Sequence, residues 1–171
     1  QSQCLACETG RYSNMIGSTS CIACSAGFYT SNISSLTCDS CQLGQYQGST
    51  GQSQCLECEE GKFASIYGSS SCSACSAGKY VSTPGNSNCS SCPKGKYQGN
   101  TGQFECEDCI IGKYTSEVGL SSCSTCDVAY NSRIGSSSCE IAAQYYFLSP
   151  PNKESMTCPS HATCKGGLYT P

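Results

Sequence analysis

Pairs of cysteine residues recur at a fixed interval of 17 residues along most of this chain, and this spacing constrains the fold more than any other feature. Self-similarity at a fixed period is typical of repeat architectures, in which each unit stacks on its neighbours. The sequence therefore predicts tandem 17-residue units rather than one globular domain. The eight C-x-x-C pairs open at Cys4, Cys21, Cys38, Cys55, Cys72, Cys89, Cys106 and Cys123.

Each unit follows the pattern C-x2-C-x2-G-x-Y and is predicted to contain two bends. In seven units a glycine lies three residues after the second cysteine, and a Tyr or Phe lies five residues after it. A second glycine lies ten residues after that cysteine, except that Ser34 takes its place in the second unit. Because glycine tolerates positive φ, both positions favour bends. The segments between them have room for short β-strands but not for helices. We expect the aromatic rings to pack against disulfides.

Cysteine takes the place of an apolar core. Nineteen of the 171 residues are cysteine, whereas Leu, Ile, Val and Phe together number only 22. So little apolar bulk cannot offset the conformational entropy lost on folding, and a cysteine content above about 8–10% marks a disulfide scaffold. Disulfides persist in oxidising compartments, so the composition indicates an extracellular or cell-surface protein of the secretory pathway.

Two disulfide pairings are compatible with the spacing. In the sequential scheme the second cysteine of each pair bonds to the first cysteine of the next pair, which gives Cys139 a partner and lets Cys4 close a loop that begins upstream. In the alternative scheme first cysteines bond to first cysteines, as in Cys4–Cys21, and Cys139 has no role. We favour the sequential scheme, in which each closed loop contributes roughly 3 kcal/mol. Its bonds are Cys7–Cys21, Cys24–Cys38, Cys41–Cys55, Cys58–Cys72, Cys75–Cys89, Cys92–Cys106, Cys109–Cys123 and Cys126–Cys139.

The C-x-x-G-x-Y pattern, with a closing cysteine fourteen residues after the opening one, resembles the first loop of tumour necrosis factor receptor cysteine-rich modules. In tandem it is similar to the ephrin-receptor-like and growth-factor-receptor-like cysteine-rich repeats of large extracellular proteins, including many from protists. The resemblance covers residues 4 to 139. It implies a small disulfide-rich fold, an elongated solenoid-like rod of short β-hairpins with little helix, and it supports the sequential pairing. It does not specify a ligand.

Every third unit is the most alike, so the chain has a second period of 51 residues. Gln1 to Leu5 recurs as Gln52 to Leu56, and Tyr46 to Gln52 recurs as Tyr97 to Gln103. Duplication of a three-unit block explains this period. A rod with about three repeats per turn explains it as well, because one face would then recur every 51 residues and suit lateral contacts in a fibre.

The chain divides into eight tandem repeats, residues 1–139, and a distinct C-terminal segment, residues 140–171, that begins a further module. The eighth repeat is one residue short, and we place the deletion between Cys126 and Tyr130. In the C-terminal segment Cys158–Cys164 is the simplest bond. Alternatively, Cys164 opens another loop and Cys158 is left without an assigned partner. Because the first residue falls inside a repeat, we expect a fragment of a longer protein.

The residues that would support catalysis or cofactor binding are scarce. His161 is the only histidine, and neither a phosphate-binding glycine loop nor a dinucleotide fingerprint occurs. The paired cysteines match the spacing of some zinc modules, but eight even pairs suit disulfides better. Acidic clusters around Cys58 and Cys106 are expected to be a solvated face rather than a calcium site. We therefore expect no enzyme activity, no cofactor and no metal.

Charge and hydropathy narrow the class of partner. A net charge of −3 argues against nucleic acid, and the best apolar run, residues 141–148, is too short to enter a membrane directly. Two N-glycosylation acceptors occur, Asn32-Ile33-Ser34 and Asn88-Cys89-Ser90, so we expect attached glycans at Asn32 and Asn88.

The sequence predicts a non-enzymatic extracellular repeat rod that forms part of a surface filament, hair or coat. Its expected partners are copies of itself or neighbouring filament subunits. The alternative is a stalk or ligand-binding ectodomain of a cell-surface receptor or adhesin, whose ligand the sequence does not identify. The regularity favours the structural role, because a binding site would interrupt the repeat.

Overall fold

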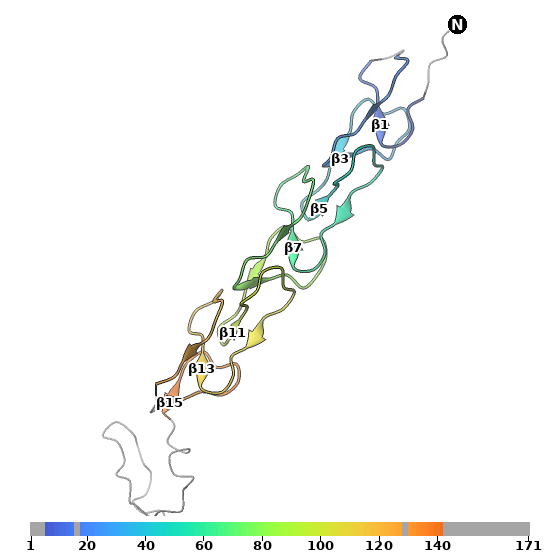
Figure 1. Ribbon diagram of the computed structural model, residues 1–171. Helices are drawn as coiled ribbons and strands as arrows, with labels where there is room; N and C mark the ends of the chain where they lie inside the picture. The colour runs from blue at the N-terminus through green and yellow to red at the C-terminus, as the bar shows by residue number, and fades with distance from the viewer. Residues whose placement is uncertain (1–5, 16–17, 128–129, 142–171) are drawn as a thin grey trace, which may run out of the picture.

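The computed structural model describes residues 6–15, 18–127 and 130–141, which form an elongated rod (Figure 1). The chain enters at one end and runs to the other without folding back. This described part contains sixteen two-residue strands and no helix. The prediction of a disulfide-rich fold made of short β-hairpins is confirmed. Cys4, His161, Cys158 and Cys164 lie outside the described residues.

Every unit is one antiparallel hairpin, and the hairpins are numbered here 1 to 8 along the chain. The first strand follows the first bend, and the second strand begins directly after the closing cysteine. The register is the same in hairpins 1 to 7: the aromatic position faces the residue after that cysteine, as in Phe63 opposite Ser73. The pairs are β1 (Arg11–Tyr12) with β2 (Ile22–Ala23), β3 (Phe28–Tyr29) with β4 (Asp39–Ser40), β5 (Gln45–Tyr46) with β6 (Leu56–Glu57), β7 (Lys62–Phe63) with β8 (Ser73–Ala74), β9 (Lys79–Tyr80) with β10 (Ser90–Ser91), β11 (Lys96–Tyr97) with β12 (Glu107–Asp108), β13 (Lys113–Tyr114) with β14 (Ser124–Thr125), and β15 (Tyr130–Asn131) with β16 (Glu140–Ile141).

One disulfide closes each hairpin, and the eight bonds are those of the sequential scheme, from Cys7–Cys21 to Cys126–Cys139. The Cα atoms of the bonded cysteines lie 5.6 to 5.8 Å apart, within the usual range for a disulfide. Hairpin 8 extends to Ile141, two residues past its closing cysteine, because its second strand lies there.

The buried side chains are few, and two buried positions recur from hairpin to hairpin. The second cysteine of each pair is fully buried in hairpins 2 to 7, and the position six residues after it is also buried, whatever its chemistry. The aromatic rings one residue earlier are only half-buried. The interior is therefore narrow and built around sulfur. The buried residues six positions after the cysteine are Thr30, Gln47, Ala64, Val81, Gln98, Thr115 and Ser132.

Four backbone hydrogen bonds join each hairpin to the next. Between hairpins 4 and 5, with the donor first, they are Gly61 to Val81 (2.9 Å), Ala64 to Asn86 (3.2 Å), Gly85 to Cys58 (2.9 Å) and Cys75 to Gly61 (2.8 Å). Equivalent bonds recur at all seven joints in the described residues. Stacking is thus fixed by the backbone rather than by particular side chains.

Hairpin 8 corrects the predicted place of the missing residue. Its first strand starts four residues after Cys126, as in the other hairpins, and the Ser132 carbonyl accepts the usual hydrogen bond from hairpin 7 (3.3 Å). The deletion therefore lies in the loop between Ser132 and Gly135, not between Cys126 and Tyr130. Asn131 consequently takes the strand position that is aromatic elsewhere. The backbone ladder fixes the register, whereas a loop can lose a residue without breaking it.

The loops that link β1 to β2, β7 to β8 and β13 to β14 project to the same side of the rod (Figure 1). Each of these hairpins is the third after the previous one, and equivalent residues in them are 51 positions apart. The 51-residue period in the sequence is thus also a period of the fold, whether or not duplication produced it.

Candidate functional site

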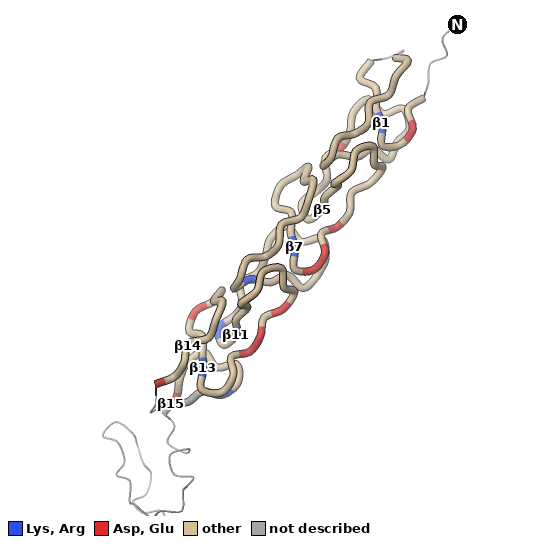
Figure 2. Tube along the Cα trace, in the orientation of Figure 1, with Lys and Arg blue, Asp and Glu red and all other residues tan. Residues whose placement is uncertain are grey.

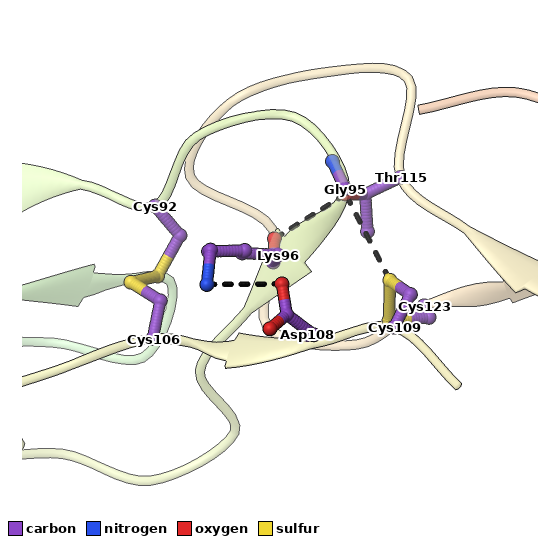
Figure 3. A network of polar contacts seen from close by, with 8 residues as sticks. All are labelled: Cys92, Gly95, Lys96, Cys106, Asp108, Cys109, Thr115 and Cys123. Atoms are coloured by element: carbon purple, nitrogen blue, oxygen red, sulfur yellow. Dashed lines mark hydrogen bonds and ion pairs between the residues drawn. A yellow bond between two sulfur atoms is a disulfide. The ribbon is translucent and has the colours of Figure 1, made fainter. Parts of the chain in front are cut away.

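The joint between hairpins 6 and 7 illustrates how side chains supplement the backbone ladder (Figure 3). Gly95 N–H donates to the carbonyl oxygen (3.1 Å) and to the hydroxyl oxygen (2.7 Å) of Thr115. The Thr115 hydroxyl donates to the Lys96 carbonyl (3.3 Å) and lies 3.9 Å from Cys109 Sγ. Lys96 Nζ lies 2.9 Å from Asp108 Oδ1 in a half-exposed ion pair. Ion pairs this exposed stabilise a fold by little.

Tyr97 and Glu107 face each other across β11 and β12, and the phenol donates to Glu107 Oε2 at 2.9 Å. This hydrogen bond and the negative charge of Glu107 raise the pKa of Tyr97 above its usual value, because ionisation would break the bond and oppose two negative charges. Tyr97 therefore remains neutral at physiological pH and makes a surface contact.

Acidic segments near β7 and β11 lie along one side of the rod (Figure 2). Glu57 and Asp108 occupy equivalent positions, 51 residues apart, as the long period predicts. The Glu59 carboxylate lies 3.0 Å from Lys62 Nζ, and both side chains are exposed. Within the described residues no group of three or more His, Cys, Asp or Glu side chains could hold a metal ion.

Exposed apolar side chains of hairpins 1, 4 and 7 lie in the three loops that project to one side of the rod (Figure 1). Met15 is 66% exposed, Ile66 is 67% exposed, Tyr67 is 60% exposed and Val118 is 57% exposed. Met15 and Ile66 are 51 residues apart, as are Tyr67 and Val118. We call these four residues the tip row. Single exposed apolar side chains are common on protein surfaces, so it is the recurrence of these residues on loops of one side that makes the tip row a candidate contact surface.

Other exposed apolar side chains lie outside the tip row, and one of them, Leu56, also has an apolar counterpart 51 positions earlier, Leu5. In the equivalent loop of hairpin 3 the tip is polar, with Ser49 and Thr50. The apolar side chains outside the row are Ile22, Phe28, Ile33, Leu36, Leu43, Leu56, Phe104, Ile110, Ile111 and Ile134.

Both predicted glycosylation acceptors, Asn32 and Asn88, are exposed, but their surroundings differ. Asn32 lies in the loop between β3 and β4. Asn88 directly precedes Cys89, which is bonded to Cys75, and its third sequon residue, Ser90, lies in β10.

Sequence reasoning did not identify two features of the structure. The buried position six residues after the second cysteine was missed because its occupants share no chemistry. The tip row was missed as a set, although comparing residues 51 positions apart for apolar character alone would have found it.

Many disulfides in tandem hairpins define a cysteine-rich repeat protein, a class typical of oxidising compartments such as the cell exterior. The family model described as tyrosine-protein kinase ephrin type A/B receptor-like matches residues 1–36, 29–75 and 78–126. The chain belongs to this ephrin type A/B receptor-like family. None of the curated proteins compared with the chain matches it. In the described part of the chain, no helix has the length and apolar character needed to cross a bilayer.

Proposed function

We propose that this chain is a non-enzymatic structural rod of the cell exterior, a section of a surface filament, hair or coat, and that it associates side by side with copies of itself. The observation that carries this proposal is the tip row. The loops that carry its members project to one side of the rod and recur at the spacing of three hairpins (Figure 1). A second copy of the chain presents the same spacing, so two rods can match contacts along their length.

The exposed area sets the expected strength of the contact. Four large side chains that are 57% to 67% exposed offer on the order of 400 Å² together, about half of the roughly 800 Å² per partner of a standard interface. One pair of chains therefore associates weakly. A longer array repeats the contact, and linked contacts strengthen one another through avidity. The net charge of −3 provides little repulsion between rods.

Sedimentation velocity and electron microscopy of the oxidised protein over a wide concentration range test this proposal. We expect monomeric rods at low concentration, and laterally paired rods or filaments at high concentration. Replacing the four tip-row residues with serine should raise the concentration needed for association at least tenfold. The control variant replaces Ile33, Phe104, Ile110 and Ile134 with serine and should associate like the original protein. Single rods at every concentration would contradict the proposal.

The second candidate function is a stalk or ectodomain of a receptor or adhesin, and the family match favours it. In that case the rod would hold a binding domain away from the cell surface. Single rods with unchanged behaviour in both serine variants are the result that this function predicts.

A further inference from the structure

Ser34 is the single non-glycine residue with positive φ in the described part of the chain, at φ 55°. It occupies the second bend of hairpin 2, where its amide donates to the Cys7 carbonyl at 2.8 Å. A non-glycine residue in this left-handed region is strained. Strain that persists at one position among many equivalents points to a function there. The equivalent bends are glycines with φ from 69° to 76°: Gly51, Gly68, Gly85, Gly102, Gly119 and Gly135.

The hydroxyl of Ser34 completes the sequence Asn32-Ile33-Ser34, an N-glycosylation acceptor that a glycine at position 34 would abolish. We propose that Asn32 carries an N-linked oligosaccharide, and that hairpin 2 retains a strained serine because the acceptor requires it. In the transfer, the bond between sugar C1 and the pyrophosphate of a lipid-linked donor breaks. A bond from C1 to Asn32 Nδ2 forms, and an amide proton leaves with the lipid pyrophosphate.

The geometry around Asn32 suits this modification. Residues 31 to 34 are all exposed, and Ile33 is 70% exposed. The Asn32 carbonyl accepts a hydrogen bond from Ser35 Oγ at 3.0 Å, which orders the backbone of the loop. The Asn32 amide and the Ser34 hydroxyl make no side-chain hydrogen bond to the residues that the structure describes, so both groups are free to meet a transferase.

The second acceptor, Asn88-Cys89-Ser90, lacks this freedom. Its central residue is bonded to Cys75, and Ser90 pairs with Tyr80 in a β-ladder. The Asn88 amide donates to Ser87 Oγ at 3.4 Å. Because the hairpin fixes this acceptor in a strand beside a disulfide, we depart from the sequence-based expectation of a glycan at both acceptors and assign none to Asn88.

The glycosylation test uses the full chain secreted from eukaryotic cells, followed by enzymatic deglycosylation in 18O water and peptide mass spectrometry. We expect 18O-labelled Asp at position 32 and unlabelled Asn at position 88. Ser34→Thr should keep the label, whereas Ser34→Ala and Ser34→Gly should lose it. An unlabelled position 32 in the folded wild-type protein, or equal labelling of both positions, would overturn the assignment.

The strain test is made without any glycan at position 32. In an Asn32→Gln background, Ser34→Gly should raise the thermal midpoint by a few degrees, and Ser34→Ala should leave it nearly unchanged. This difference isolates the backbone conformation from the sugar. Equal midpoints for the glycine and alanine variants would overturn the claim that hairpin 2 accepts strain to keep its acceptor.

Discussion

At the scale of the residue, the two bends of each hairpin make different demands on their glycines. In hairpin 3 both Gly44 and Gly51 have positive φ, at 79° and 71°. A Cβ added to Gly44 would collide with the backbone carbonyl of Gly85, two hairpins along the rod. A Cβ added to Gly51 would lie 3.6 Å from Ala23 Cβ, an ordinary contact. The second bend therefore tolerates a side chain, as Ser34 illustrates, and the first bend does not.

This difference predicts unequal costs for two alanine substitutions. Gly51→Ala should destabilise the protein by about 1–2 kcal/mol, the cost of a left-handed non-glycine residue. Gly44→Ala adds a collision with backbone that cannot move easily, so it should cost roughly 2–5 kcal/mol in total. Urea unfolding of the oxidised variants, followed by tyrosine fluorescence, measures both. Equal losses of unfolding free energy in the two variants would mean that the close approach of Gly44 to the Gly85 carbonyl does not limit the first bend.

At the scale of the element, a hairpin of this protein cannot be stable alone. Each strand has two residues, and isolated two-stranded hairpins are marginal in water even when longer. The disulfide supplies what the strands cannot, since it closes a loop with a sequence separation of 14 residues in seven of the hairpins. The buried cysteine also provides most of the hairpin's interior, as Cys58 at 0% exposure does in hairpin 4.

Removing one central disulfide should therefore cost about 2–5 kcal/mol. The variant Cys58→Ala with Cys72→Ala leaves no free thiol to exchange with the remaining bonds. Its unfolding midpoint in guanidinium should fall, and limited proteolysis should cut first within hairpin 4. The matched control removes Cys126 and Cys139 from hairpin 8 and should leave the central hairpins resistant. An unchanged midpoint in the central variant would show that backbone stacking suffices without the bond.

At the scale of the whole molecule, contacts extend beyond nearest neighbours. Besides the four backbone bonds at each joint, the second bend of each hairpin from 3 to 8 reaches back to the first bend two hairpins earlier, as Gly102 does to Gly61. Interior hairpins are thus held by more partners than hairpins at the end of the described array. Unfolding of stacked repeats propagates inward from their ends when interior interfaces are stronger.

Native-state hydrogen exchange should reveal this gradient. The amides of Gly10 and Gly61 make equivalent bonds, to Thr30 (2.8 Å) and to Val81 (2.9 Å). We expect the Gly61 amide to exchange at least tenfold more slowly, because hairpin 1 has neighbours on one side only within the described array. Equal protection factors would indicate that the rod opens as one cooperative unit.

The cysteine spacing and the glycines predicted the hairpins and their pairing because these constraints are local and covalent or conformational. The buried position six residues after the cysteine could not be predicted, because polar residues satisfy it as well as Ala64 or Val81 does. Gln98, for example, donates from Nε2 to the Glu105 carbonyl (2.9 Å) across its own loop. The deletion in hairpin 8 was misplaced because residue type alone aligns Tyr130 with the aromatic position of the other hairpins. The strand pairing instead places Asn131 there, opposite Glu140, the residue after the closing cysteine.

The projection of every third hairpin to one side means that a change in the length of this rod is also a rotation. Inserting or deleting three hairpins preserves the phase between surface features at the two ends. Adding a single hairpin instead turns everything beyond it to face another direction, with each hairpin left intact. The number of repeats therefore sets the angle at which whatever lies beyond the array is presented.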